Sequence, residues 1–540
     1  MRRWVVMTLY GAGWILLAAA IAAPLIGIVI GFSRPGQADN SVYGIARPGE
    51  LLVRSVTLSM IATLGAILLG LMPAAALGSA PGRRLAVLTG LMLAPLLIPP
   101  QVYVYAWQIA LSPQAFLGRL MARLPGCDGG PWAGGEVKAG LISAAWLWPV
   151  VAFIVAAGWR STGRSVYMMA LLDTTPTRAF FRAVLPSLRP HLLAAGALVF
   201  AVTLVEYAIP HLSLAAVYPT ALQVLYDAGA PPRQMLTVAG HVFALVIVAL
   251  VLVAWSLRDV SAWQSVETEE SDTTLTWRRP GRTVSLGTAV IWLISVGLPA
   301  AVMLAWLRVP GAWKEGFLLF EREWRVSLLV AISAGVLTVM LATVTALLRV
   351  AAENRRQRIG PTVGLALILL AALIPPAALG QGFVLFYNRP YGPGLLGVVA
   401  GKLGDIYAET PVLWVLGLVA RYAIIASLVV WLSVGRRGNV LADQARSDGA
   451  DRFALLGWVL IPAVWPSLLA AGLIVTVLSL FEVVLGQMLS PADFSGIAQS
   501  ILNQMHYGQD DVIITTSLIV MTAGILLTQG CGWLLAWRRR

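Results

Sequence analysis

The sequence predicts an all-α integral membrane protein with about twelve transmembrane helices, arranged as two parallel six-helix repeats. The chain is 59% hydrophobic and only 12% charged, whereas soluble domains carry about 25% charged residues. Long apolar stretches recur along its whole length, each near the roughly 20 residues that cross a bilayer. Short motifs also recur at one constant separation of 276 residues. So few charges could not cover a water-soluble body of this size, and much of the surface must therefore face lipid.

Twelve apolar stretches define the predicted spans, six on each side of a polar segment. Their approximate bounds are 4–32, 56–79, 85–112, 139–158, 188–210, 236–256, 284–307, 326–348, 360–387, 411–434, 464–486 and 512–536. The first is longer than the apolar core of a signal peptide, about 7–15 residues, so we expect it to be retained. The chain then divides into a first transmembrane repeat, 1–260, a cytoplasmic linker, 261–283, and a second transmembrane repeat, 284–540.

Basic residues predict the orientation, because cytoplasmic loops of membrane proteins carry an excess of Lys and Arg. With the N-terminus inside, 24 of the 38 basic residues fall in cytoplasmic segments and 13 in external ones. An even number of spans returns the C-terminus to the cytoplasm as well. Because the net charge of +13 follows this distribution, we expect contact with membrane lipid and not with nucleic acid.

Matching motifs in the two halves predict the internal repeat. Leu-Ile-Pro-Pro occurs at 97–100 and again at 373–376, and Leu-Leu-Ala-Ala-Gly occurs at 192–196 and 468–472. The Pro-Pro pairs indicate broken or kinked helices, because proline lacks the backbone donor that continues a helix. Six spans in each half give both halves the same orientation, so we expect a pathway at the interface between them.

The sequence lacks recognisable motifs for catalysis or for ATP hydrolysis. A phosphate-binding loop requires Gly-Lys followed by Ser or Thr, but the only such pair, Gly401-Lys402, precedes Leu403. The four histidines are too scattered to form a metal cage, and two cysteines imply no disulfide framework. We therefore expect no enzyme activity, no metal and no cofactor in this chain. Any ATP that drives it would bind to a partner ATPase subunit.

A long cytoplasmic loop follows the fourth span of the second half. Asp448 and Gly449 favour a turn in which Gly449 takes a positive φ. Asp451 is placed to cap the helix that follows, and Pro462 is expected to end that helix. These features predict two short helices joined by a turn.

The first half has a similar loop after its own fourth span. Thr175 stands at the capping position, 276 residues before Asp451, and Pro176 occupies the favoured first position of the helix. Pro186 is expected to end this helix, as Pro462 does in the second half. The alternative interpretation is that both loops are only basic connectors on the cytoplasmic side.

The loops resemble the cytoplasmic loop of the membrane subunits of binding-protein-dependent ABC importers. The pattern in that family is Glu-Ala-Ala, three residues, Gly, and a Leu-Pro about a dozen residues later. The second loop matches the pattern at Asp443, Ala445, Gly449 and Ile461-Pro462, with Asp in place of Glu and Gln444 in place of the first Ala. The first loop departs further, with Tyr167 and Asp173 at the acid and glycine positions and with Phe180 and Leu185-Pro186 retained.

The resemblance covers nearly the whole chain, and fused double-length permeases of this kind resemble the ferric-iron and thiamine importer group. It implies a permease subunit in the bacterial inner membrane, working with two cytoplasmic ATPase subunits and an extracytoplasmic solute-binding protein. It also implies that both loops, including Ala450 and Asp451, dock into clefts on the ATPase subunits. Ferric iron is the solute expected from the resemblance, with thiamine, polyamine or phosphonate as alternatives.

A proton-coupled secondary carrier with twelve spans is the alternative class of protein. Such carriers place an acidic, glycine-containing loop between the second and third spans. Here that loop is Pro81-Gly82-Arg83-Arg84, which contains no acid.

Three charged residues fall well inside the predicted spans, away from their cytoplasmic ends. Glu206 and Glu482 occupy equivalent positions toward the outer ends of the fifth and eleventh spans, and Arg421 lies near the middle of the tenth. A charge inside a membrane is costly and therefore faces the interior of the bundle or a cavity. The three residues can line a translocation path, with two acids for a cation or an arginine for an anion. The alternative is an internal ion pair that holds the helices together.

Overall fold

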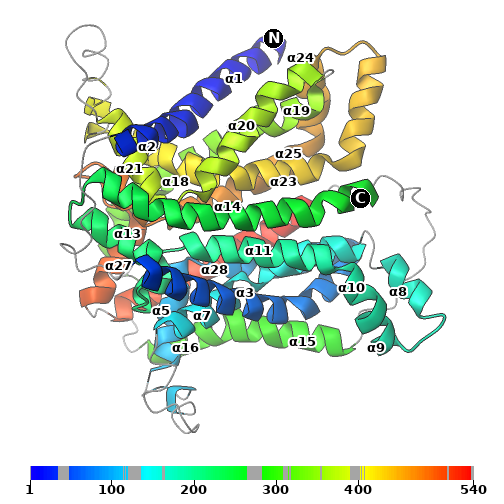
Figure 1. Cartoon of the computed structure of the whole chain (residues 1–540), viewed down its shortest axis with the longest axis horizontal. Coiled ribbons are helices and arrows are strands. Elements are labelled where there is room, and N and C mark those ends of the chain that lie inside the picture. The colour runs from blue at the N-terminus through cyan, green and yellow to red at the C-terminus, as the bar shows by residue number, and fades with distance from the viewer. Residues whose placement is uncertain are drawn as a thin grey trace.

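The structure of the protein is a computed structural model, which describes residues 2–33, 48–112, 115, 117–119, 135–160, 164–263, 282–307, 314, 318–352, 355–388, 402, 404–406, 408–507 and 510–536. Within these ranges the chain is helical and contains no strand. Most of the long helices cross the view of Figure 1 side by side. The predicted linker, 261–283, lies almost entirely outside the described residues.

The helices of the first half differ widely in length. They are α1 Arg2–Leu17, α2 Ala23–Ser33, α3 Pro48–Gly78, α4 Gly82–Leu97, α5 Pro100–Ala110, α7 Gly135–Gly158, α8 Arg164–Ala170, α9 Pro176–Ala179, α10 Leu185–Ser187, α11 Arg189–Val205, α12 Ala208–Leu212, α13 Tyr218–Asp227 and α14 Pro232–Trp263.

The second half follows a similar order. Its helices are α15 Arg282–Trp292, α16 Leu298–Trp306, α18 Glu321–Ala342, α19 Leu348–Ala351, α20 Arg355–Leu373, α21 Pro376–Tyr387, α23 Val412–Ser447, α24 Arg452–Ala454, α25 Ile461–Leu480, α26 Val484–Leu489, α27 Ile497–Tyr507 and α28 Asp510–Ala536.

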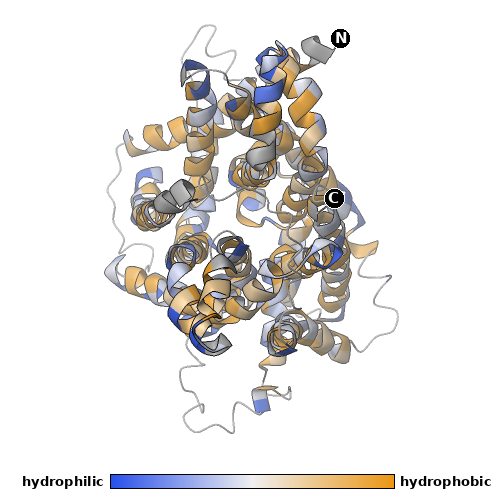
Figure 2. Cartoon of the chain, turned by 90° about the vertical axis from the view of Figure 1, so that its right-hand side faces the viewer, coloured by the Kyte–Doolittle hydropathy of each residue, from blue (hydrophilic) through white to orange (hydrophobic). Residues whose placement is uncertain are grey.

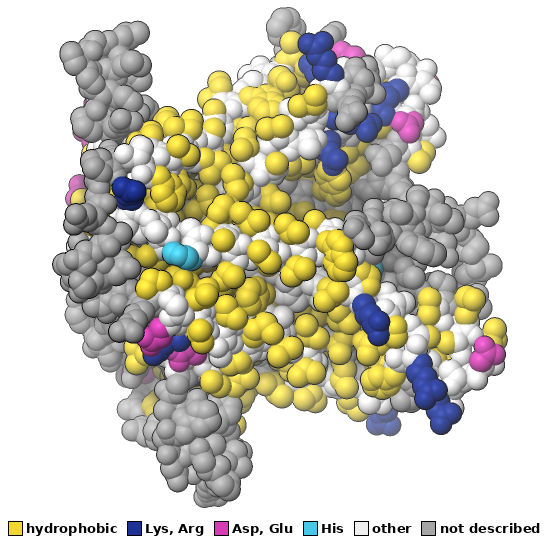
Figure 3. Space-filling model, in the orientation of Figure 1, with side chains coloured by type: hydrophobic (Ala, Val, Ile, Leu, Met, Phe, Trp, Pro, Cys, Tyr) yellow, Lys and Arg dark blue, Asp and Glu magenta, His cyan; other side chains and the backbone are white. Residues whose placement is uncertain are grey.

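Ten helices in the described residues are long and apolar enough to cross a membrane, and the number is twelve if each of two bent pairs counts as one span. The surface agrees with this assignment. Hydrophobic side chains cover most of the face seen in Figure 3, whereas most of its basic side chains lie near the right-hand edge. Figure 2, which looks onto that edge, shows hydrophobic residues predominating along many of the helices. The all-α, multi-pass membrane prediction is therefore confirmed.

Both Pro-Pro motifs break a helix, as the sequence predicts. α4 ends at Leu97 and α5 begins at Pro100, with a bend of 82° between them. In the second half α20 ends at Leu373 and α21 begins at Pro376. The predicted spans 85–112 and 360–387 are therefore each two helices, because two consecutive prolines remove two backbone donors.

Single prolines later in the spans have a different effect. Four π-helical turns end two residues before a proline: Ala18–Ala22 before Pro24, Phe180–Val184 before Pro186, Leu293–Gly297 before Pro299, and Leu455–Leu460 before Pro462. A π-helical turn is wider than an α-helical one, so it relieves the clash between the proline ring and the preceding carbonyls. The chain therefore remains helical through these positions.

The first helices of each half pack against the other half. α1 contacts α18 and α24, and α2 packs along α21. In the same way α15 packs against α3, and α16 against α5. The halves are thus interlocked, and neither first helix lies within its own half alone.

Two faces at the ends of the helices position the candidate sites. We name the end that carries α8, α9 and α24 the loop face, and the end that carries α5, α13, α21 and α27 the opposite face. They lie toward the right and left of Figure 1, and the start of α1 lies beside α24 at the loop face.

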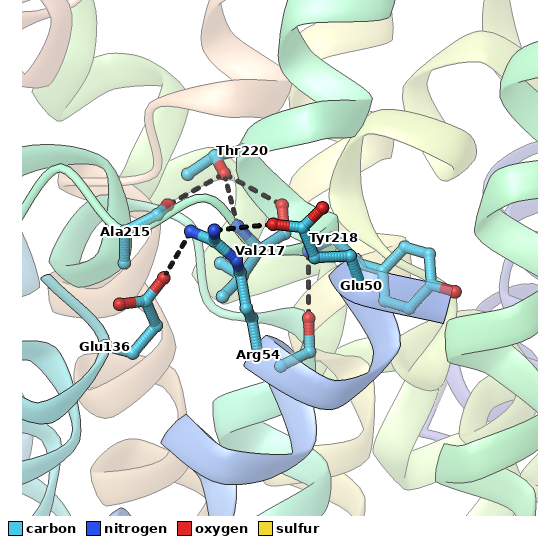
Figure 4. Close-up of polar contacts among 8 residues, drawn as sticks. Glu50, Arg54, Glu136, Ala215, Val217, Tyr218 and Thr220 are labelled. Carbon is cyan, nitrogen blue, oxygen red and sulfur yellow. Dashed lines mark hydrogen bonds and ion pairs between the residues drawn. The ribbon is translucent and has the colours of Figure 1, made fainter. Parts of the chain in front are cut away.

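A buried serine anchors the short helix at the opposite face in each half. Ser55 on α3 accepts a hydrogen bond from the backbone N–H of Tyr218 at 3.0 Å, and Ser327 on α18 accepts one from Ile497 at 2.9 Å. Figure 4 shows the first of these anchors beside Arg54, which bridges Glu50 and Glu136. These contacts hold α13 and α27 at the ends of the spans.

Candidate functional site

The second loop contains a fully formed helix-ending turn. Gly449 has a φ of +82°, and its N–H donates to the carbonyl of Arg446 at 2.9 Å. The N–H of Ala450 donates to the carbonyl of Ala445, also at 2.9 Å. This pair of hydrogen bonds around a left-handed glycine is the Schellman motif, which ends a helix by satisfying its last carbonyls. The predicted positive φ of Gly449 is confirmed.

Asp451 begins the next helix, as predicted. Its backbone is extended, and its carboxylate accepts a hydrogen bond from the N–H of Ala454 at 2.8 Å. The carboxylate thus satisfies one of the free donors at the start of α24. Asp443, Ser447, Asp448 and Gly449 are exposed, so the turn presents a polar edge at the loop face.

Two details of the predicted loop are wrong. The helix before the turn is not a separate short helix, because α23 continues without interruption from the span to Ser447. Pro462 does not end the helix after the turn either. The π-helical turn Leu455–Leu460 accommodates it, and the chain passes directly into α25. The turn at Gly449 therefore joins two helices that both extend into the spans.

An arginine ties each loop to the end of the second span in its half. Arg446 donates to the carbonyls of Val350 at 2.7 Å and Ala352 at 3.3 Å, and it pairs with Asp443 at 2.7 Å. In the first half Arg160 donates to the carbonyls of Leu77 and Ala80, each at 2.8 Å. Basic side chains at a helix C-terminus stabilise its free carbonyls. The sequence did not reveal this role, because the partners are 80 to 96 residues away.

The first loop has the predicted order of a short helix, a turn and a second short helix. α8 ends at Ala170, and α9 begins at Pro176, directly after Thr175. Asp173 lies in the turn and is exposed, and its φ is not positive. This turn therefore needs no glycine, in contrast to the turn at Gly449.

The helix after this turn ends later than predicted. Phe180 belongs to this helical segment; its side chain is half-buried, and its ring centroid lies 6.2 Å from that of Trp159. Helical structure continues past Pro186, and the bend of 60° falls at Leu188, between α10 and α11. The two loops thus share their place in the fold but differ in the geometry of their turns.

The N-terminal helix braces only one of the described loops. Tyr10 on α1 packs edge-to-face on Phe453, with ring centroids 5.8 Å apart, and the Arg452 guanidinium lies over both rings. An open cavity of about 410 Å³ lies between Val6 and the segment from Gly449 to Trp458. The second loop is therefore held from two sides, by α1 and by Arg446.

Arg421 satisfies the backbone at a helix break. Its guanidinium donates to the carbonyls of Ala372 at 3.1 Å and Ile374 at 3.4 Å, next to the Pro-Pro motif of the second half. In the first half the indole N–H of Trp146 donates to the carbonyl of Ile98 at 3.1 Å, at the equivalent break. Within the described residues Arg421 has no carboxylate at ion-pair distance. In this part of the structure Arg421 therefore binds backbone carbonyls and not a carboxylate.

Glu206 and Glu482 have different partners although they occupy equivalent positions. Glu206 follows the end of α11, and its two carboxylate oxygens accept the N–H groups of Ala208 and Ile209, each at 2.9 Å. It therefore caps the start of α12. Glu482 follows the end of α25 and accepts the hydroxyl proton of Tyr422 at 2.8 Å. Both residues fall inside the predicted spans 188–210 and 464–486, but the observed helices are shorter. α11 stops at Val205 and α25 at Leu480, so each helix ends before its glutamate.

These polar residues gather between the two halves. Glu206 interacts electrostatically with both Glu482 and Arg421, and Tyr422 interacts with all three. All four are half-buried and not fully buried. The sequence did not single out Tyr422, although its place beside Arg421 in the same span was a usable signal. The cluster thus places two carboxylates, a guanidinium and a phenol between the halves.

Comparisons with known proteins returned no relative of this chain. No family model matches it, and no curated protein and no solved structure matches it. In the described residues no group of three or more His, Cys, Asp or Glu side chains is placed to hold a metal ion. The fold and the two sites are therefore the basis for a functional proposal.

Proposed function

We propose that the chain is the transmembrane permease subunit of an ATP-driven ABC importer. The observation that supports this most is the turn at Gly449, with its two Schellman hydrogen bonds and the Asp451 cap. A rigid, exposed turn between two helices that both reach the membrane can transmit movement from a cytoplasmic partner to the spans. A plain basic connector would need neither the left-handed glycine nor the fixed arginine behind it.

The loop face is, in this proposal, the cytoplasmic face of a bacterial inner membrane. Two ATPase subunits bind there, one at each loop, and both chain ends lie on the same side. A solute-binding protein delivers the solute to the opposite face. The matched helix breaks, serine anchors and arginine caps support two six-helix repeats with the same orientation.

The charged cluster supports a cationic solute. Glu206 and Glu482 supply two carboxylates, whereas Arg421 uses its donors on backbone carbonyls. Two ionised carboxylates beside one arginine leave a net negative charge, which attracts cations and repels anions. Ferric iron is the cation that we propose, ahead of thiamine and polyamines, and a phosphonate is the least compatible of the alternatives.

Reconstitution into sealed vesicles tests the proposal. We expect uptake of ferric ion only when ATP, the ATPase subunits and the binding protein are all present. Omitting the ATPase subunit should abolish uptake, and a proton gradient should not replace it. Uptake driven by the proton gradient alone would instead establish the secondary carrier.

A further inference from the structure

Three polar side chains join the two halves at the opposite face. α13 supplies Gln223 and Asp227, one helical turn apart, and α26 of the second half supplies Gln487. The amide of Gln223 donates to Asp227 Oδ1 at 3.0 Å and to Gln487 Oε1 at 3.2 Å. The amide of Gln487 donates to Asp227 Oδ1 at 3.3 Å. One carboxylate oxygen thus accepts hydrogen bonds from both halves.

The three side chains lead from the surface inward. Asp227 is exposed at the end of α13, Gln487 is half-buried, and Gln223 is only 3% exposed. The buried Oε1 atom of Gln223 has no hydrogen-bond partner among the described residues. A buried amide oxygen without a partner is unfavourable, so a ligand that gave this oxygen a partner would be stabilised.

The charge around this network favours a cation. Within the described residues Asp227 has no cationic side chain at ion-pair distance. Tyr207 interacts electrostatically with both Asp227 and Glu206. Asp227 at the opposite face is therefore linked through Tyr207 to the acidic cluster between the halves. Carboxylate and amide oxygens are the ligands that hard cations prefer.

We propose that Gln223, Asp227 and Gln487 form a cation-binding latch between the two halves. With no cation bound, Gln487 donates to Asp227 and accepts from Gln223, and these two hydrogen bonds hold α13 against α26. A hard cation that binds to the Asp227 carboxylate displaces the amide donors. The oxygen of Gln223, on the same helix as Asp227, turns toward the ion, whereas Gln487 on α26 is released. Because the cation binds the open arrangement more tightly than the closed one, it shifts the population toward the open state. This inference rests on the transport function proposed above.

Spin labels at Ala228 and Ala492 test the latch in the full chain without any ATPase subunit. Both residues are exposed and lie outside the network, after α13 and α26 respectively. Lanthanum(III) serves as the probe because it is a hard, diamagnetic trivalent cation. We expect lanthanum to raise the ratio of long to short label distances about tenfold or more. Asp227→Asn should keep a closed network but lose this response.

Two further variants complete the test. Gln487→Leu removes one arm of the latch and should populate the long distance without lanthanum. Asp493→Asn neutralises another exposed acid of the second half and should leave the lanthanum response unchanged.

An unchanged distance in the parental protein, or an undiminished response in Asp227→Asn, would overturn the latch. Because no ATPase takes part, neither result bears on recruitment of an ATPase at the loop face. Failure of recruitment would in turn refute the proposed function and leave the distance measurements standing.

Discussion

Substitution of Gly449 by valine is the most direct test of the turn at the loop face. A Cβ atom at this position would meet no atom within 4 Å, so the side chain begins in open space. The φ of +82° is the only obstacle. An L-residue in this region is strained, and a β-branched residue most of all. The variant therefore perturbs backbone conformation alone.

The size of the effect follows from this strain. A left-handed conformation costs an L-residue about 1–2 kcal/mol, and relaxation out of it breaks the two hydrogen bonds of the Schellman motif, each contributing about 1 kcal/mol. We therefore expect Gly449→Val to lose about 2 kcal/mol of the free energy of ATPase binding, which corresponds to about 30-fold weaker binding. Gly449→Ala should lose about 1 kcal/mol of this binding free energy, which weakens ATPase binding about fivefold. Gly449→Asn should stay near the parental value, because asparagine tolerates this conformation.

The assay is the binding of the ATPase subunit to purified permease, together with ATP hydrolysis stimulated by the loaded binding protein. Expression and thermal stability in detergent serve as controls for folding, and both should change little because the turn is exposed. Asp173→Val is the matched variant in the first loop. Its φ is not positive, so we expect an effect of less than about twofold.

Parental binding and parental stimulated hydrolysis in Gly449→Val would refute the reasoning. Equal losses in Gly449→Asn and Gly449→Val would also refute it, because the effect would then not depend on backbone strain. Either result would remove the main support for ATPase docking at this loop.

Three further predictions concern the spans and the orientation. The double variant Glu206→Gln and Glu482→Gln should reduce ferric-ion uptake about tenfold or more while ATPase binding persists; parental uptake would mean that these acids do not contact the solute. Arg421→Leu should lower the free energy of unfolding by about 1–3 kcal/mol, because it leaves two carbonyls at a helix break without their donor. An unchanged melting temperature would contradict a structural role for Arg421. Cysteine at Ala450 should react only from the cytoplasm and cysteine at Ala228 only from outside in sealed cells, whereas the reverse pattern would invert the proposed orientation.

Much of the fold was predictable because its determinants are local. A stretch of about 20 apolar residues crosses a bilayer whatever surrounds it, so composition alone indicated a multi-pass protein. Two consecutive prolines break a helix in any context, and the breaks fall at Pro99 and Pro375 as expected. Gly449 and Asp451 were predictable for the same reason, since φ and an N-cap depend on residues within one turn.

The effects of single prolines were not predictable in the same way. The sequence predicts that Pro186 and Pro462 end helices. In the structure a π-helical turn precedes each of them, and the chain remains helical through both prolines. None of the local rules applied to the sequence decides between a π-helical turn and a break.

The sequence by itself determined the apolar segments, the helix breaks at the two Pro-Pro motifs and the place of the turn at Gly449. Only the tertiary structure decided the partners of the charged residues. It directs Arg421 to backbone carbonyls, Glu206 to the start of α12, and Arg446 to the end of α19. A charge in a membrane must find a partner, but which partner it finds depends on helices that are distant in the sequence and adjacent only after packing.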